Sequence, residues 1–258
     1  MSRTNLDFTP LLVTRNPSGS FYLIDKNTLE VVLCDAAGKE LKRAGGSGTG
    51  SSGFIDPAEI IWRGMMLYVL DRGAKSVKLF DRFLNFIGEK KLDGIFVTSK
   101  IADPSSLTVN DFGEIFISDR LNHTILAADQ AFNERNDIYY IENIPGKKMQ
   151  FPVRIISDGD YVAVKDSAGL YLFDRFLNYI NYTPLHKEEQ FAGIPKGSLL
   201  LIENNTIRVS KLSAPEGIPR LYVLPDERII SPVVILNRLY YISGNTIASV
   251  NLDTLLYE

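Results

Sequence analysis

Residues that most often hold metals or act as nucleophiles are scarce in this sequence. It contains two histidines, His123 and His186, and a single cysteine, Cys34. Structural zinc is usually held by four Cys or His ligands, and these residues are widely separated. Cys34 lies in the apolar run VVLC, which favours a buried thiol, whereas His186 lies in the polar run LHKEEQ and is expected to be exposed. We therefore predict no metal site and no disulfide.

Other reactive sites are equally poorly supported. The sequence has no G-x-S-x-G nucleophile elbow, and its histidines give no basis for a Ser–His–Asp triad. The run GGSGTGSSG at 45–53 is glycine-rich, but it lacks the Lys-Ser/Thr pair and the following helix of a phosphate-binding loop. We interpret it as a flexible loop between two structural repeats. No catalytic residue and no cofactor are predicted.

The carboxylates and prolines instead follow a regular spacing. The prolines are separated by 47, 47 and 48 residues, and two series of aspartates are separated by 46, 48 and 47 and by 46, 48 and 45. These series are Pro10, Pro57, Pro104 and Pro152; Asp25, Asp71, Asp119 and Asp166; and Asp35, Asp81, Asp129 and Asp174. Three independent series with one period indicate an internally repeated architecture.

Each long repeat contains short runs rich in Val, Ile, Leu, Phe and Tyr, bounded by Gly, Asp and Asn, which is typical of β-strands. Residues 57–90 contain four of them, PAEIIW, LYVLD, SVKLF and NFIGEK. Four strands in each of six repeats predict an all-β fold, a six-bladed β-propeller with four-stranded antiparallel blades. We expect one domain over 1–258, with blades at approximately 8–53, 54–100, 101–150, 151–190, 191–230 and 231–258.

The end of the chain leaves two ways to complete the sixth blade. Either the C-terminal run TLLYE completes it alone, or the N-terminal segment SRTNLDF supplies a strand. Both remain open at the level of the sequence.

One phrase occurs twice, as FDRFLNFI at 80–87 and FDRFLNYI at 173–180. Both copies fall at the turn between the third and fourth strands of a blade. We expect Asp81 and Asp174 to start these turns by accepting backbone N–H groups. The aromatic residues Phe80, Phe83, Phe173 and Phe176 are expected to pack between blades. A repeated binding surface formed by Arg82 and Arg175 is the alternative interpretation of the phrase.

The composition is that of an ordinary globular protein. Of the 258 residues, 45% are hydrophobic and 23% are charged, and the net charge is −3. An overall acidic chain is a poor electrostatic match for nucleic acid. The sequence has no apolar run of the roughly 20 residues that span a bilayer and no signal core at its start. The compartment is unknown: cytoplasmic if the chain is complete, periplasmic or secreted if it is a trimmed mature form.

The repeats resemble those of the NHL family. Residues 104–129, PSSLTVNDFGEIFISDRLNHTILAAD, have an opening Pro104, Gly113 before an aliphatic–aromatic strand, Asp119 at its end and an Asn122-His123 pair before the next strand. The glycine-rich lead at 45–60 also resembles the family. The resemblance is clear over 8–182. It implies a six-bladed NHL-type propeller, with His123 in a structural turn position, and implies little about function.

Related propellers suggest one enzymatic alternative. Lactonase-type propellers coordinate a cation near the central channel through oxygen ligands. Here the equivalent positions, two residues after each blade proline, are Glu59, Ser106 and Arg154. A cation-dependent hydrolase would use Glu59. The single carboxylate and the nearby Arg154 make this the weaker hypothesis.

Recognition of a protein or peptide partner is the function that we predict, because loops on a rigid scaffold commonly carry binding. Arg72 and Arg120 follow equivalent strand ends in neighbouring blades, so their guanidiniums should lie on one face; the alternative is that each pairs with a nearby acid. The predicted partner-binding face is Glu59, Arg72, Arg120, Arg154, Lys147 and Lys148. RNA binding, as in some NHL propellers, is the second alternative. We expect a non-catalytic scaffold of unknown oligomeric state.

Overall fold

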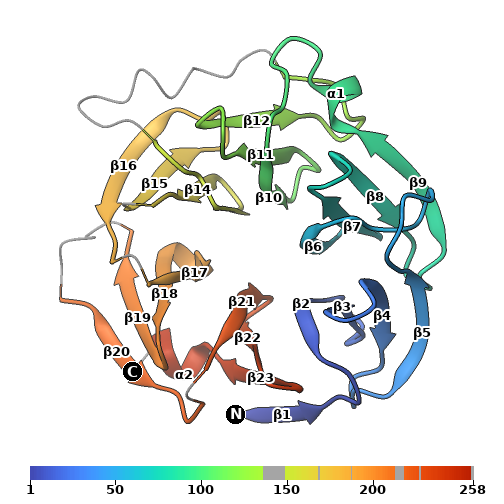
Figure 1. The fold of residues 1–258 in the computed structure, drawn as a ribbon. Coiled ribbons are helices and arrows are strands. Elements are labelled where there is room, and N and C mark those ends of the chain that lie inside the picture. The colour runs from blue at the N-terminus through green and yellow to red at the C-terminus, as the bar shows by residue number, and fades with distance from the viewer. Residues whose placement is uncertain (136–148, 168, 187, 213–217, 227, 257–258) are drawn as a thin grey trace. The chain divides into compact units, whose positions relative to one another are not determined.

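The computed structural model describes residues 1–135, 149–167, 169–186, 188–212, 218–226 and 228–256. The chain divides into two compact units, the first formed by 1–43 and 188–258 and the second by 44–187. Each unit contains three antiparallel sheets, and all but the one formed by β1 and β21–β23 consist of consecutive strands (Figure 1). The all-β architecture predicted from the sequence is confirmed.

The second unit contains the sheets of blades two, three and four. Blade two has the order β6-β7-β8-β9, blade three β10-β11-β12, and blade four β13-β14-β15-β16. The strands are β6 Pro57–Arg63, β7 Met66–Asp71, β8 Ser76–Phe80, β9 Phe86–Lys91, β10 Pro104–Val109, β11 Ile115–Asp119, β12 Thr124–Ala128, β13 Arg154–Asp158, β14 Tyr161–Lys165, β15 Gly169–Asp174 and β16 Tyr179–Pro184. The predicted fourth strand of blade three falls in 136–148, outside the described residues.

The first unit contains blades one, five and six. Their orders are β2-β3-β4-β5, β17-β18-β19-β20 and β1-β23-β22-β21. The strands are β1 Ser2–Asn5, β2 Pro10–Arg15, β3 Phe21–Asp25, β4 Glu30–Cys34, β5 Glu40–Gly45, β17 Gln190–Gly193, β18 Ser198–Glu203, β19 Thr206–Lys211, β20 Arg220–Val223, β21 Ile230–Ile235, β22 Arg238–Ser243 and β23 Thr246–Asn251.

The sixth blade is completed by the N-terminal segment. Strand β1 pairs antiparallel with β23, from Ser2 opposite Ser249 to Asn5 opposite Thr246. The C-terminal residues form the short helix α2, Asp253–Leu256, instead of a strand. Of the two closures that the sequence left open, the structure has the one in which the two ends of the chain share a sheet.

Hydrophobic residues are buried between neighbouring sheets of each unit. In the second unit, one cluster joins blades two and three, with Leu70, Val77, Leu107 and Ile117 fully buried. A second cluster joins blades three and four and includes Phe116 and Phe173. A sheet whose two faces are both apolar is stable only when neighbours cover it, which explains why strands such as β8 are buried at every position.

The duplicated phrase forms the expected turns, but part of the packing prediction was wrong. The Asp81 carboxylate accepts the Phe83 N–H at 2.8 Å, and Asp174 accepts the Phe176 N–H at 2.9 Å. Phe80 and Phe173 are buried, whereas Phe83 and Phe176 are 56% and 51% exposed. The chain leaves the sheet at the aspartate, so the second aromatic residue lies in the turn and is exposed.

Helices are short in the described residues. Beside α2, the helix α1, Leu92–Ile95, follows β9 and buries Leu92 and Ile95 against the blade two and blade three cluster. No helix in the described part of the chain has the length and apolar character needed to cross a membrane.

Candidate functional site

The first strands of blades two, three and four are joined by a network around Glu59. This side chain is buried, and one of its oxygens accepts the Ser106 hydroxyl at 2.7 Å and lies 3.4 Å from an Arg154 nitrogen. The Ser106 hydroxyl oxygen also accepts the Ile155 N–H at 3.2 Å. The structure therefore brings together the three residues that the sequence placed two positions after each blade proline. These three side chains come from the first strands of three successive blades, and both Ser106 and Arg154 contact Glu59.

Arg72 and Arg120 occupy equivalent positions at one edge of the second unit. We call this the proline edge, because β6 and β10 begin there at Pro57 and Pro104, and β13 begins there at Arg154. Arg72 Nε donates to Asp56 at 2.7 Å, and Arg120 Nε donates to Asp103 at 2.7 Å. Each Arg thus pairs with the acid just before the neighbouring first strand, which confirms the alternative stated from the sequence.

The proline edge also exposes apolar side chains. Ile55 precedes Asp56, Leu121 follows Arg120, and Phe151 and Val153 lie just before Arg154. Their exposed fractions are 48%, 59%, 45% and 40%. Arginine next to exposed aliphatic and aromatic groups is typical of the centre of protein interfaces. The predicted contacts Lys147 and Lys148 lie outside the described residues.

The repeated aspartates at the ends of the second strands are structural. Asp119 is fully buried, and its two oxygens accept the N–H groups of Ala102 at 2.7 Å and Asp103 at 3.0 Å. It also accepts N–H groups from Leu121 and Asn122, each at 3.2 Å. The carboxylate therefore accepts the backbone N–H groups of the loop that leads into the first strand. Each blade has such a loop, which explains why the aspartate recurs with the period of the blades.

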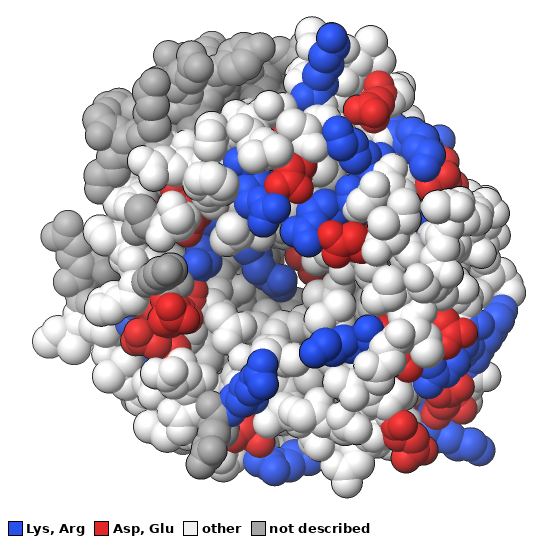
Figure 2. Space-filling view, in the orientation of Figure 1, with Lys and Arg blue, Asp and Glu red and all other residues white. Residues whose placement is uncertain are grey.

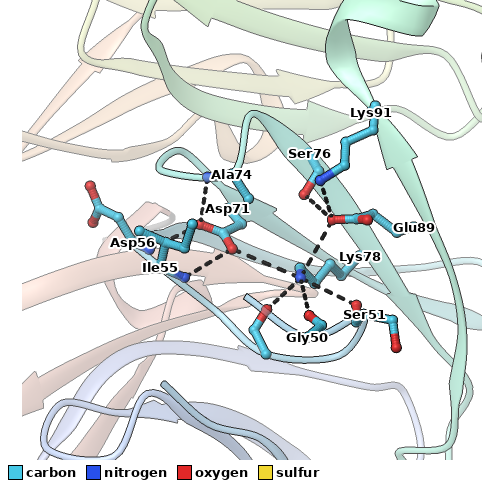
Figure 3. Close-up of polar contacts among 11 residues, drawn as sticks. Gly50, Ser51, Ile55, Asp56, Asp71, Ala74, Ser76, Lys78, Glu89 and Lys91 are labelled. Carbon is cyan, nitrogen blue, oxygen red and sulfur yellow. Dashed lines mark hydrogen bonds and ion pairs between the residues drawn. The ribbon is translucent and has the colours of Figure 1, made fainter. Parts of the chain in front are cut away.

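Lys78 forms an unexpected buried polar cluster on β8 (Figure 3). Its side chain is 2% exposed, and its ammonium contacts the carbonyl oxygens of Gly50, Ser51 and Gly53. Glu89 lies 3.4 Å away, and the Phe54 ring centroid lies 5.5 Å away. The glycine-rich run predicted to be a flexible loop is thus held by an ammonium group. A single apolar-flanked lysine in SVKLF was the only sequence signal for this arrangement.

Burial acts to raise the pKa of Glu89, but hydrogen bonds from Lys91 and Ser76 and the charge of Lys78 outweigh it. The pKa of Glu89 therefore lies below its ordinary value. The carboxylate stays charged and pairs with the Lys78 ammonium. This cluster is closed to ligands, because its cation and anion already face each other.

Cys34, His123 and His186 lie in different local surroundings. Cys34 is a free buried thiol, and burial raises its pKa to about 12. His123 lies in a turn with φ of 55° and packs edge-on against Phe151, and His186 is exposed. Among the described residues, no group of three or more His, Cys, Asp or Glu side chains is arranged to hold a metal ion.

The opposite edge of the second unit holds residues that sequence reasoning undervalued. We call it the hairpin edge, because the β6–β7, β10–β11 and β13–β14 turns lie there and β8 and β15 end there. Arg63 donates to the Val109 carbonyl at 2.8 Å and to Asp111 at 2.6 Å. Arg175 lies over the Phe112 ring, and the distance from its guanidinium carbon to the ring centroid is 4.0 Å.

Both signs of charge are present on the surface. Figure 2 shows Lys and Arg side chains together with Asp and Glu side chains on the face that it draws. Ion pairs occur at both edges of the second unit, Arg63–Asp111 at the hairpin edge and Arg120–Asp103 at the proline edge. Such a surface resembles a protein interface more than the continuous basic groove that follows a nucleic-acid backbone.

Comparison with known proteins identifies the fold. The sequence matches no protein-family model and no curated protein. A streptogramin B lyase structure covers 97% of this chain and 86% of its own, with 15% identity and a TM-score of 0.66. Virginiamycin B lyase from Staphylococcus aureus covers 97% and 87%, with 13% identity and a TM-score of 0.65. BamB from Moraxella catarrhalis covers 92% and 70%, with 10% identity and a TM-score of 0.51.

These likenesses show that the chain is a six-bladed β-propeller, as the repeats predicted. At identities of 15% and below they concern the fold alone. The resemblance to NHL repeats, noted from the sequence, stays a prediction.

Proposed function

We propose that this propeller is a non-catalytic interaction module that presents the proline edge of residues 44–187 to a protein or peptide partner. The observation that carries the proposal is the matched pair of Arg72 and Arg120. Each is bound to an acid in the same way, and their side chains are 34% and 36% exposed. Ion pairs fix the direction of both guanidiniums while leaving surface available for contact.

The composition around the two arginines supports a protein partner. Exposed Ile55, Leu121, Phe151 and Val153 lie beside them on the same edge, and a partly apolar surface with fixed Arg groups is common at interface centres. Glu59 and Arg154 belong to the proposed face by position, but Glu59 is buried. We assign Glu59 the role of holding Arg154 in place.

The hydrolase alternative has weaker support. A catalytic divalent cation would need several oxygen ligands, whereas the Glu59 oxygen already accepts a hydroxyl at 2.7 Å and lies 3.4 Å from the Arg154 guanidinium. A positive charge at that distance opposes cation binding. RNA binding is the remaining alternative, and the net charge of −3 argues against it.

The proposal is tested by retention of partners from the cells that produce the protein. The immobilised wild type is compared with the double variant Arg72→Glu/Arg120→Glu. A matched control is Lys196→Glu, which breaks a surface Lys–Asp pair of 3.0 Å in the other unit. We expect the double variant to lose a discrete partner that the wild type and the control retain. Equal retention by all three proteins would exclude the proline edge as the contact surface.

A further inference from the structure

The Arg-Phe pair of the duplicated phrase is not required by the turn in which it lies. In the described part of the chain, four turns that follow a third strand begin with an aspartate whose Oδ1 accepts the N–H groups two and four residues later. Two of them have Ala36-Ala37 and Gln130-Ala131 after the aspartate. The same turn therefore forms without arginine and without an aromatic residue.

Both Arg-Phe pairs lie at the hairpin edge of the second unit with their rings exposed. The Arg82 guanidinium carbon lies 4.5 Å from the centroid of the Phe83 ring, and that of Arg175 lies 4.8 Å from the centroid of Phe176. Exposed phenylalanines that neither build the turn nor enter the core lower solubility without stabilising the fold. Their presence is explained if they contact a ligand.

Arg175 has a second aromatic neighbour from blade three. Phe112, 52% exposed, lies in the β10–β11 turn, where Asn110 Oδ1 accepts the N–H groups of Phe112 at 3.0 Å and Glu114 at 2.9 Å. This is the turn geometry of the duplicated phrase, now started by asparagine. The Arg175 guanidinium carbon is 4.0 Å from the Phe112 centroid. Two rings from adjacent blades thus fix the guanidinium.

Arg175 makes a long ion pair with Glu114. Its Nε is buried and has no hydrogen-bond partner in the described part of the chain. The nearest carboxylate oxygen, on Glu114, is 3.6 Å from its terminal nitrogen, beyond hydrogen-bond length. Glu114 is held elsewhere, by Arg135 at 3.0 Å and Asn110 at 2.6 Å. A guanidinium that is fixed by two rings, loosely ion-paired and 27% exposed is suited to a planar oxyanion.

We propose that Arg175, with Phe112 and Phe176, binds a carboxylate side chain of a peptide, while the two exposed rings contact apolar residues next to that carboxylate. This site lies at the opposite edge of the second unit from the proline edge, so it goes beyond the function proposed above. An acidic peptide fits better than nucleic acid, because the site offers one guanidinium between two rings and not the continuous basic groove that a nucleic-acid backbone follows.

The test uses pairs of synthetic hexapeptides with blocked ends. One member of each pair carries a single Glu flanked by Leu and Phe in varied order, and the other carries Gln in its place. Affinity for the full chain is measured by fluorescence anisotropy at physiological salt. We expect at least one pair in which the Glu peptide binds about tenfold more tightly than its Gln partner. Arg175→Gln should remove that preference.

Two further variants separate binding from folding. Arg82→Gln changes the matching position of the other copy and should leave the preference intact. Phe112→Ala introduces the residue that the equivalent turns have at Ala37 and Ala131, so the turn should be retained. This variant should bind both peptides of a pair more weakly. Equal affinity for Glu and Gln peptides, or a preference that survives Arg175→Gln, would overturn the proposal. The proposal would also be overturned if no peptide bound and the protein instead bound an eight-nucleotide oligouridine in a manner that depends on Arg175.

Discussion

The Lys78 ammonium lies 3.4 Å from a carboxylate oxygen of Glu89, directly opposite it on the neighbouring strand. Because Lys78 also contacts three carbonyl oxygens of the 50–53 segment, we expect Lys78→Met to lower the free energy of unfolding by about 3 kcal/mol. Urea unfolding measures this change. Cleavage of the glycine-rich loop by a protease should accelerate in the same variant.

Lys91 provides the matched control for Lys78. It also pairs with Glu89, at 2.9 Å, but its side chain is 59% exposed. Lys91→Met should therefore cost less than about 1 kcal/mol. Equal costs for the two lysines would contradict the role of the buried ammonium in holding the loop.

The lowered pKa of Glu89 makes a pH-dependent prediction. A carboxylate whose pKa is lower in the folded state stabilises the protein above its unfolded value of roughly 4.3, and this contribution is lost as the pH falls through the folded pKa. Glu89→Gln should therefore be less stable than the wild type at pH 7, and the difference should shrink below pH 4. A difference that is constant from pH 7 to pH 3 would show that Glu89 acts without its charge.

The two phenylalanines of each duplicated phrase should differ in their effect on stability. Phe80→Ala and Phe173→Ala remove buried rings and should each cost about 3–5 kcal/mol. Phe83→Ala and Phe176→Ala remove exposed rings, so each should cost less than about 1 kcal/mol. Thermal unfolding of the four variants measures this contrast, and similar losses would mean that the exposed rings are also part of the core.

Substitution of Asp119 should destabilise the fold more than substitution of Asp129, which belongs to the other aspartate series. The buried Asp119 carboxylate accepts four backbone N–H groups, so Asp119→Ala should cost at least about 3 kcal/mol. Asp129→Ala, in a turn nearer to solvent, also removes hydrogen bonds to backbone but should cost about 1 kcal/mol. Chemical denaturation of both variants compares a buried loop anchor with a surface turn.

Most of the fold could be predicted from the sequence because its determinants are local and repeated. Pro57 and Pro104 start first strands, and Asp71 and Asp119 end second strands, as the period indicated. The sequence could not decide how blade six is completed, because the N-terminal segment whose Ser2 pairs with Ser249 carries no repeat signature.

The sites were harder to predict, because they depend on contacts between blades. The sequence correctly placed Arg72 and Arg120 at equivalent positions, and their acids are nearby in the chain. It gave no indication that Arg175 would meet Phe112, since the two residues lie in different blades. It also could not indicate that a lysine within the apolar run SVKLF would bind the carbonyl groups of a preceding loop.

The most direct test of the proposed function is photo-crosslinking from the proline edge. A benzophenone amino acid is placed at Leu121, which is 59% exposed and adjacent to Arg120, and as a control at Val223, which is 74% exposed in the other unit. We predict that Leu121 gives a covalent adduct with one discrete protein in the producing cells, that Val223 does not, and that Arg72→Glu/Arg120→Glu removes the adduct. An adduct that persists in the double variant, or none at Leu121, would contradict the account.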